Sequence, residues 1–413
     1  NANDGALVIG NLDGSKTGNV TVKGNIGETN AIGKVQASNN STLTVEGTVV
    51  QTNELHVMPG AEIVADKADI TVDASGDNVT ILGDITAKSL TFSATGTHQL
   101  IAGGATLDLG SLNGASDTTI QVGDDAEGGL GATVTTTNLV LGGGSIFVDP
   151  DWHKPAGFVV TEKLDTSKGG SAASGSGTLD GNAYVGKNAV LGIGFAKTDA
   201  GLAELKALVA PYLVDNGGFA ESGVKNALVI NDSITVDTNK GIAVDAELTS
   251  TNYTNTPPTN AIKLGAGAAL VITDKALDEG AAAAITFANA TASLTSGDGA
   301  KVVLVGDFTA ADKGQKIFAA NNGSAKVTGT VKVEAAGGLL VGQITDGSIA
   351  SLALDPDAEK AIRSEVSAPV GQLFVDFANG KFDGATGAGY DFLVDAISGK
   401  QFKAVDAAAH AAT

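Results

Sequence analysis

Short bursts of alternating aliphatic and polar residues, separated by turn clusters, constrain the fold of this chain more than any other feature. From the N-terminus to about residue 149, aliphatic residues recur at every second position in brief runs. Examples are the pairs Val20 and Val22, Ile70 and Val72, and Leu107 and Leu109. Because a period of two places these side chains on one face of an extended backbone, each run predicts a short strand.

Clusters of Asn, Gly, Asp and Ser separate the runs, as at 38–41, 75–78 and 123–125, and these residues favour turns. Hydrophobic residues make up 43% of the chain and aromatic residues only 4%, so the core must be thin and aliphatic. The pattern predicts an all-β fold, a right-handed parallel β-helix in which coils of about 20 residues stack about 4.8 Å apart. A β-sandwich array is the alternative fold.

The rhythm divides the chain into four parts. Residues 1–149 are expected to form the N-terminal part of the β-helix and residues 224–354 its C-terminal part. Between them, residues 150–223 are expected to form an insertion that contains a flexible Gly/Ser run and an amphipathic helix capped by Thr198 or Asp199. Residues 355–413 are expected to form a capping region and a helical linker, with a strand at 373–377 and an exposed helical tail at 404–412.

Charge and composition exclude several classes of partner. The formal net charge is -21, and the only arginine is Arg363, so nucleic acid and anionic membranes are unfavourable partners. Cysteine is absent, which is compatible with export through an oxidising compartment. No apolar run is long enough for a membrane helix, and the start at Asn1 carries no basic and apolar leader, so we interpret the chain as a mature segment.

These features together resemble the passenger domain of a type V autotransporter, of the adhesin or self-associating type. The resemblance is carried by short strands rich in Gly, Asn, Thr and Asp, by the acidic charge, by the scarcity of Cys and Arg, and by the aromatic-richer stretch at 372–397. It implies secretion to the cell surface, at the outer membrane of a Gram-negative bacterium. In that family a membrane barrel follows the passenger, and this chain contains no such barrel.

Motifs for catalysis are missing from the sequence. The string at 296–300 lacks the serine of the Gly-Asp-Ser-Gly motif found in serine-protease passengers, and the serine-rich run at 171–176 forms no Gly-x-Ser-x-Gly. A β-helical polysaccharide lyase or hydrolase is the enzymatic alternative. Asp69 and Asp73 share a strand face and are its candidate acid/base pair, but we favour a solvated strand face as the interpretation of these two residues. We therefore predict that the chain is not an enzyme.

Metal ligation is also disfavoured by the spacing of the candidate ligands. His56, His98, His153 and His410 are scattered, with no metal-binding spacing. The acidic turn at 124–127 and the Asp149/Asp151 pair leave calcium as an alternative with few ligands in sequence. No cofactor is predicted.

Polar positions beside the aliphatic runs are the candidate binding residues. Thr80, Thr136 and Asn138 are out of phase with the neighbouring aliphatic residues, so we expect them to point away from the interior. Trp152, the only tryptophan, is either a hydrophobic plug or a platform for a sugar ring. The expected function is adhesion or self-association through polar faces, with a second copy, a host glycan or a host surface protein as partner. A structural surface-layer or stalk protein is a further alternative.

Overall fold

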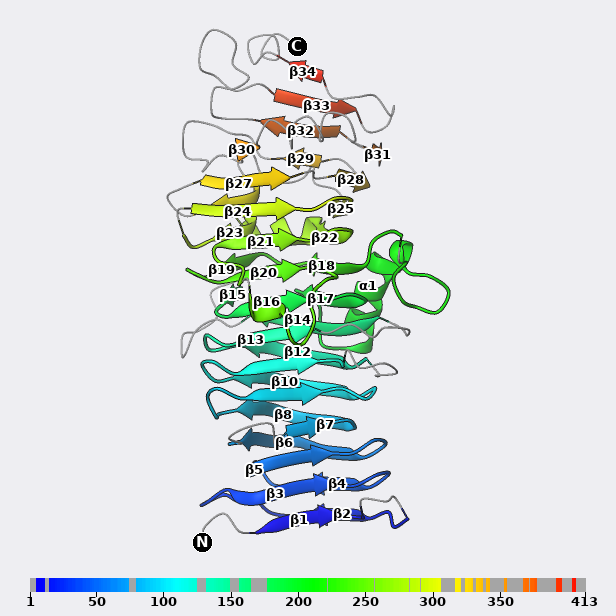
Figure 1. Cartoon of the computed structure of the whole chain (residues 1–413), viewed down its shortest axis with the longest axis vertical. Coiled ribbons are helices and arrows are strands. Elements are labelled where there is room, and N and C mark those ends of the chain that lie inside the picture. The colour runs from blue at the N-terminus through cyan, green and yellow to red at the C-terminus, as the bar shows by residue number, and fades with distance from the viewer. Residues whose placement is uncertain are drawn as a thin grey trace. The chain divides into compact units, whose positions relative to one another are not determined.

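Parallel strands stacked coil upon coil dominate the computed structural model of the chain (Figure 1). The structure describes residues 5–11, 15–73, 79–124, 131–148, 156–164, 177–220, 222–255, 257–281, 283–289 and 291–305, together with the strand backbones that follow residue 305. The chain divides into two units. Unit 1 contains residues 1–165, 180–219 and 247–256, and unit 2 contains residues 166–179, 220–246 and 257–413.

Unit 1 is built almost entirely of short strands. Its strands are β1 (Ala6–Ile9), β2 (Asn19–Val22), β3 (Ile32–Ala37), β4 (Thr42–Val45), β5 (Val49–Val57), β6 (Glu62–Val72), β7 (Val79–Ile81), β8 (Asp84–Phe92), β9 (His98–Ile101), β10 (Thr106–Gly114), β11 (Thr119–Val122), β12 (Thr133–Val140), β13 (Ser145–Val148), β14 (Gly157–Leu164), β16 (Asn182–Val185) and β17 (Ala189–Ile193). Its helices are α1 (Asp199–Val209) and the short 3-10 helices η1 (Ala210–Tyr212) and η2 (Tyr253–Asn255).

Each strand of unit 1 pairs in parallel with the equivalent strand one coil later. Strand β6 pairs with β8, β8 with β10, and β10 with β12, so that Ile63, Ile85 and Leu107 lie in one row across three coils. Parallel pairing between successive turns of one chain is the arrangement of a β-solenoid. The predicted all-β, parallel solenoid is therefore confirmed at this level.

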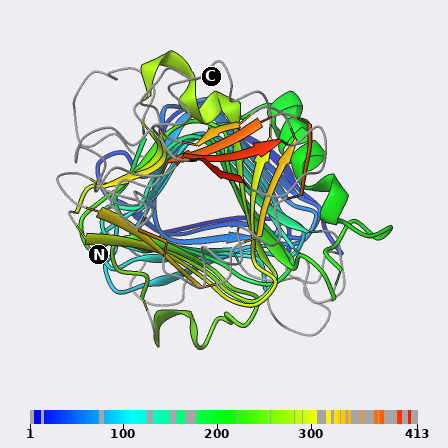
Figure 2. The ribbon, with the colours of Figure 1, turned by 90° about the horizontal axis from the view of Figure 1, so that it is seen from above.

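The coils of unit 1 have three faces. Face I contains β2, β4, the first halves of β6, β8, β10, β12 and β14, and then β17. Face II contains the first half of β5, the second halves of β6, β8, β10 and β12, and the end of β14. Face III contains β1, β3, the second half of β5, β7, β9, β11, β13 and β16. Seen from above, the blue and cyan strands follow the sides of one ring (Figure 2).

Bends between faces I and II explain why one strand serves both. In β8 the alternation of buried and exposed residues breaks at Lys88 and Ser89, which both point outward, and it then resumes with Leu90 buried. Strand β10 repeats the break at Gly110, where an added Cβ would lie 2.5 Å from the carbonyl oxygen of Lys88. Glycine therefore fits the bend because the neighbouring coil leaves no room for a side chain.

Aliphatic rows fill the interior of unit 1. One row on face I contains Leu43, Ile63, Ile85, Leu107, Val134, Val159 and Leu191, all at most 2% exposed. A row on face III continues from Val57 through Ile81, Ile101, Val122 and Val148 to Val185. Branched side chains of similar size suit such a row because each stacks on an equivalent residue in the next coil.

Helix α1 lies on the outside of the coil. Thr198 caps it by accepting a hydrogen bond from the Gly201 amide at 3.2 Å, as the sequence predicted. Leu205 is fully buried, and it approaches the outer side of β17 so closely that a Cβ on Gly192 would lie 2.6 Å from it. The helix ends at Val209, where η1, which contains Pro211, follows directly.

The predicted insertion at 150–223 is too wide. Strands β14, β16 and β17 lie within it, and they pair in register with β12, β13 and β14 respectively. The sequence was misleading here because segments rich in Pro, Gly and Ser interrupt the local rhythm of the sequence, whereas the strands that follow them pair in register with the preceding coil. Most of the Gly/Ser run lies outside the described residues.

Unit 2 repeats the parallel arrangement. Its strands are β15 (Gly177–Leu179), β18 (Asn226–Ile230), β19 (Ile234–Val236), β20 (Gly241–Val244), β21 (Ala261–Leu264), β22 (Ala268–Thr273), β23 (Ala283–Phe287), β24 (Thr291–Ser296), β25 (Lys301–Val305), β26 (Lys316–Ala320), β27 (Ser324–Gly329), β28 (Lys332–Ala336), β29 (Leu339–Val341), β30 (Ala353–Leu354), β31 (Ser367–Val370), β32 (Gln372–Asp376), β33 (Asp391–Asp395) and β34 (Lys403–Val405). A 3-10 helix, η3 (Asp274–Gly280), follows β22. Strand β18 pairs in parallel with β22, and β22 with β25.

The C-terminal part of unit 2 differs in strand direction. Strands β32, β33 and β34 pair antiparallel, and β32 coincides closely with the strand expected at 373–377. The expected helical linker and most of the helical tail expected at 404–412 lie outside the described residues. Ala404 and Val405 belong to β34, so the predicted helical tail is wrong at its first two residues.

Candidate functional site

The outer side of face II carries two rows of short polar side chains. We call these rows the polar ladder; it consists of Asp69, Ser89, Ser111 and Asn138 in one row and Thr71, Thr91 and Asn113 in the other. All seven residues are partly exposed. The rows are straight because the parallel register repeats without a shift from Asp69 to Ser89 and Ser111.

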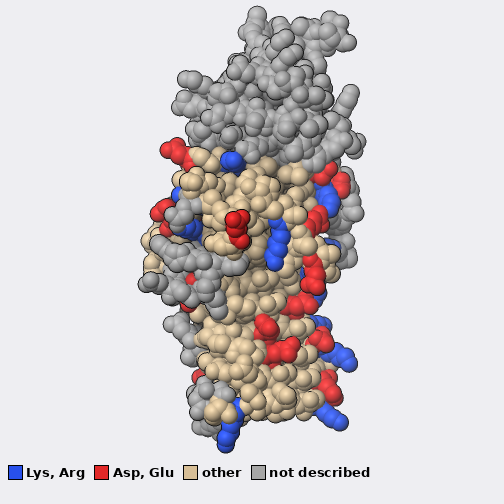
Figure 3. Space-filling view, turned by 90° about the vertical axis from the view of Figure 1, so that its right-hand side faces the viewer, with Lys and Arg blue, Asp and Glu red and all other residues tan. Residues whose placement is uncertain are grey.

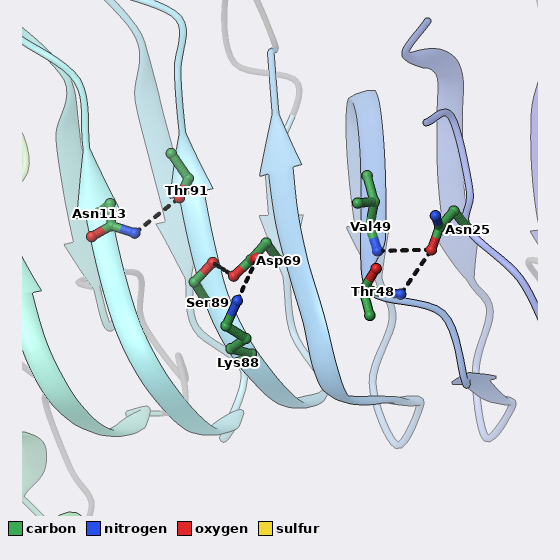
Figure 4. A network of polar contacts seen from close by, with 8 residues as sticks. All are labelled: Asn25, Thr48, Val49, Asp69, Lys88, Ser89, Thr91 and Asn113. Atoms are coloured by element: carbon green, nitrogen blue, oxygen red, sulfur yellow. Dashed lines mark hydrogen bonds and ion pairs between the residues drawn. The ribbon is translucent and has the colours of Figure 1, made fainter. Parts of the chain in front are cut away.

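Asp69 is held by two hydrogen bonds from the next coil. The Ser89 hydroxyl donates to Asp69 Oδ1 at 2.8 Å, and the Lys88 ammonium donates to Asp69 Oδ2 at 2.7 Å (Figure 4). Partial burial raises the pKa of the Asp69 carboxyl, but the hydrogen bonds from Lys88 and Ser89 and the charge of Lys88 outweigh it. The net effect lowers the pKa, so Asp69 is an ionised carboxylate whose charge Lys88 balances.

The second row is ordered by hydrogen bonds across and along the coils. Ser111 donates to Asn113 Oδ1 at 2.6 Å, and Asn113 Nδ2 donates to Thr91 Oγ1 at 2.9 Å (Figure 4). These bonds fix the rotamers of three neighbouring side chains before any ligand arrives. The ladder is therefore preorganised, which lowers the entropy lost on binding.

An asparagine shapes the entry to the first strand of face II. Asn25 Oδ1 accepts hydrogen bonds from the backbone amides of Thr48 at 2.7 Å and Val49 at 3.1 Å (Figure 4). The next residue, Ile26, then pairs with Val50 at the start of β5. This contact links two consecutive coils at the bend, so Asn25 supports the geometry of the face.

Faces I and III carry more charge than the polar ladder. On face I, Glu62 and Asp84 are direct neighbours in register, and both are exposed. On face III, Glu54 lies 3.5 Å from both Lys34 and His56. Figure 3 shows one side of the molecule, on which acidic side chains gather towards one edge while much of the remaining lower surface is uncharged.

His56 is a half-buried histidine with a lowered pKa. Burial lowers the pKa of His56, and the charge of Lys34 lowers it further, against the opposing effect of Glu54. The imidazole is therefore neutral at pH 7. It lies beside Gln36 and Thr80 in register, in a row that then reaches the apolar Leu100.

The structure separates the predicted binding residues. Asn138 belongs to the polar ladder, and Thr80 lies on the outer side of face III. Thr136 was expected to point outward, and this is wrong: it is fully buried, and its hydroxyl donates to the carbonyl oxygen of Asn138 at 2.9 Å. The bend at Thr137 and Asn138 places two consecutive residues outside, which reverses the alternation. Trp152 lies outside the described residues.

Five ladder residues were not identified from the sequence. Thr71, Ser89, Thr91, Ser111 and Asn113 are common residues in turn-rich chains, so none is conspicuous alone. Their signal is the recurrence of a short polar side chain one coil later, as in the 22-residue separation of Thr91 and Asn113. The bends hide this signal because they interrupt the period of two.

The candidate acid/base pair of the enzymatic alternative is not assembled. Asp69 binds Lys88 and Ser89, whereas Asp73 accepts a hydrogen bond from the Ser93 hydroxyl at 3.2 Å. Within the described parts of the chain, no group of three or more His, Asp or Glu side chains has the arrangement of a metal site. The serine-rich run at 171–176 lies outside those parts.

Other outward positions of unit 1 are covered by its own chain. Phe147 and Tyr184 are neighbours in register on the outside of face III. Tyr253 stacks on Phe147, with ring centroids 4.7 Å apart, and meets Tyr184 edge-on at 5.0 Å. Burial, followed by the proximity of Tyr253, raises the pKa of Tyr184 to about 12. These rings are consequently packing residues rather than an exposed platform.

Among the described residues, the chain has no helix of the length and apolarity needed to cross a bilayer. Comparisons with models of known protein families, with curated proteins and with solved structures found no match to this chain.

Proposed function

We propose that this protein is a non-catalytic adhesive protein of a bacterial cell surface, and that it makes contact through the polar ladder of face II. The observation that carries the proposal is the ladder itself, a preorganised row of hydroxyl and amide groups with one balanced ion pair. Such a surface has many hydrogen-bonding groups and no assembled acid/base pair. It suits binding better than bond cleavage.

The ladder differs from the rest of an acidic protein because the charge of Asp69 is balanced by Lys88, its other six residues are uncharged, and the first row continues from Asn138 to a cation, Lys163. The chain has a net charge of -21, and charged faces of two such bodies repel each other. An exposed ion pair contributes only about 0 to 1 kcal/mol, so ion pairs alone would compensate poorly. Many weak hydrogen bonds on a neutral face become effective when numerous copies act together on a cell.

The wider setting of the proposal follows the resemblance to autotransporter passengers. We infer a right-handed coil, the hand favoured when parallel strands of one sheet are connected, and secretion to the surface of a Gram-negative bacterium. The partner is a second copy on a neighbouring cell, a host glycan or a host surface protein. This setting predicts that the protein acts outside the cell, at the outer membrane.

Surface display tests the proposal. Bacteria that display the chain are expected to clump or to attach to a surface. Bacteria that display a Ser89→Lys/Ser111→Lys variant are expected to lose both clumping and attachment, because the variant adds charge to the ladder. The matched control is Thr86→Lys/Thr106→Lys, which adds the same charge to the same two strands on face I. Wild-type cells that neither clump nor attach, or equal loss in both variants, would refute a role for face II.

A salt series adds an independent test of the mechanism. At an ionic strength of 0.15 M, the Debye length is about 8 Å, and more salt screens the repulsion between acidic bodies. Contact through the neutral ladder is expected to survive or strengthen as salt rises. Contact that weakens steeply with salt would indicate an ionic interface instead.

A further inference from the structure

We propose that the ligand of the polar ladder is a neutral, extended polysaccharide that lies along the coil axis, with about one sugar residue for each coil. This inference rests on the proposed function, because it uses the same face. The juxtaposition that carries it is the unbroken register Asp69, Ser89, Ser111 in one row, beside Thr71, Thr91, Asn113 in the other. Each coil therefore presents one pair of short polar side chains.

The spacing of these pairs matches an extended glycan. Neighbouring strands in a sheet lie about 4.8 Å apart, so equivalent side chains recur at that distance along the ladder. An extended chain of β-linked hexoses advances by a similar length for each residue. Successive sugars therefore meet successive coils; in an extended β-1,4-linked chain every second sugar presents the same edge, so equivalent contacts recur at every second coil and add along the polymer.

The ladder keeps hydrogen-bonding capacity after its internal bonds are made. Thr91 Oγ1 accepts from Asn113 and still carries a hydroxyl proton to donate. Asn113 Nδ2 has two protons, of which this bond uses one. Ser89 donates its proton to Asp69 and retains lone pairs that accept. Alternating donors and acceptors of this kind are what sugar hydroxyls require.

Charge decides between a glycan and a second copy as the favoured partner. A second copy brings another -21 towards the same face, whereas a neutral polysaccharide brings no charge. Acidic polysaccharides are disfavoured for the same reason. The electrostatic cost is therefore lowest for a neutral chain.

The absence of aromatic residues from the ladder sets how affinity depends on polymer length. Its members are Ser, Thr, Asn and Asp, so a sugar ring finds no flat apolar surface on which to stack. Each sugar contributes only hydrogen bonds to exposed groups, which are individually weak because water competes for them. Short oligosaccharides should bind poorly, and binding should strengthen until the glycan spans the ladder.

A sedimentation assay with the purified full chain tests the inference. Amorphous cellulose, a neutral β-linked glucan, is the probe, and insoluble calcium alginate is the anionic counterpart. The wild-type protein is expected to sediment with cellulose and not with alginate. A Ser111→Val/Asn113→Val variant, which keeps strand-forming residues, is expected to bind cellulose at least about tenfold more weakly, corresponding to about 1.4 kcal/mol. The face I control Thr86→Val/Thr106→Val should bind as the wild type does.

Soluble cello-oligosaccharides of increasing length provide a measurement on the wild-type protein alone. Competition that strengthens with length supports the inference even if the valine variant folds poorly. Absence of cellulose binding, equal binding to alginate, or equal loss in both variants would overturn it. Displayed cells that clump while cellulose neither binds nor competes would overturn the glycan inference and leave the proposed function standing. If the protein neither binds cellulose nor causes clumping, both the glycan inference and the proposed function are refuted.

Discussion

Two regions of unit 1 share one backbone plan and differ on the outside. From β6 to β10, outward residues are polar and partly exposed, and buried residues alternate with them. From β13 to β17, outward positions such as Phe147, Phe158 and Val160 are apolar and buried. The first region is bare, and the second is covered by α1 and by the segment around Tyr253.

This difference shows how a solenoid separates structure from function. The interior rows are aliphatic in both regions, so they supply stability without distinguishing one coil from another. The outward residues determine whether a coil receives a covering segment or remains open to a partner. The side chains of the polar ladder are polar and can remain exposed to solvent, so no covering segment in the described part of the chain blocks the ladder from a partner.

We expect the largest loss of stability from a substitution that disrupts the covering of the second region. Phe147→Ala removes a fully buried ring that stacks on Tyr253, so we expect the free energy of unfolding to fall by about 3–5 kcal/mol. Urea unfolding followed by circular dichroism measures the change. Ser111→Ala, an outward residue of the bare region, is the control and should change the stability by less than about 0.5 kcal/mol. Equal effects would contradict the distinction between the regions.

Helix α1 offers a more local test. Leu205→Ala removes a buried contact between the helix and the outer side of β17, at an expected cost of about 2–4 kcal/mol. Hydrogen exchange should become faster in α1 than in the strands of β8 and β10, because the helix has lost its anchor while the interior rows are intact. Uniform acceleration across both regions would show that the helix and the coils unfold as one unit.

Replacing a polar residue in the interior of the bare region is expected to raise the stability of the protein. Gln99 is 1% exposed, pairs with Ile120 in the interior, and has an Oε1 atom with no hydrogen-bond partner among the described residues. Gln99→Leu should raise the stability by about 1 kcal/mol because it removes a buried, unsatisfied acceptor. Gln121→Leu should give a smaller gain, because it removes a buried Oε1 of the same kind but also removes the hydrogen bond from Gln121 Nε2 to the carbonyl oxygen of Gly123. Thermal melting compares the two variants.

The smallest expected effect concerns the ion pair of the ladder. Lys88→Met removes a hydrogen bond and a positive charge from Asp69, so the pKa of the carboxyl should rise towards its ordinary value. Because the folded-state pKa lies below the unfolded value, the pair stabilises the protein above the unfolded pKa, and this stabilisation disappears as the pH falls through the folded pKa. NMR titration of Asp69 measures the shift. An unchanged pKa would show that Ser89 alone lowers it.

Particular residues show how far the sequence could be read. The pairs Ile70 and Val72, and Leu107 and Leu109, were correctly assigned to strands with a shared buried face. Thr198 was correctly identified as a helix cap. The orientation of Thr136 was wrong because a bend reverses the alternation, and the extent of the insertion was wrong because the strands keep their register on both sides of segments with irregular composition.

The sequence by itself determined the local structure of this protein: short strands, aliphatic interior rows, turns and one capped helix. Local preferences and a period of two are sufficient for these, since both depend on neighbouring residues. Only the tertiary structure decided which polar residues share a surface. Thr91 and Asn113 meet because the coil closes between them, and their separation along the chain depends on bends and loop lengths that no local pattern records. The polar ladder is therefore a property of register, which arises when coils stack.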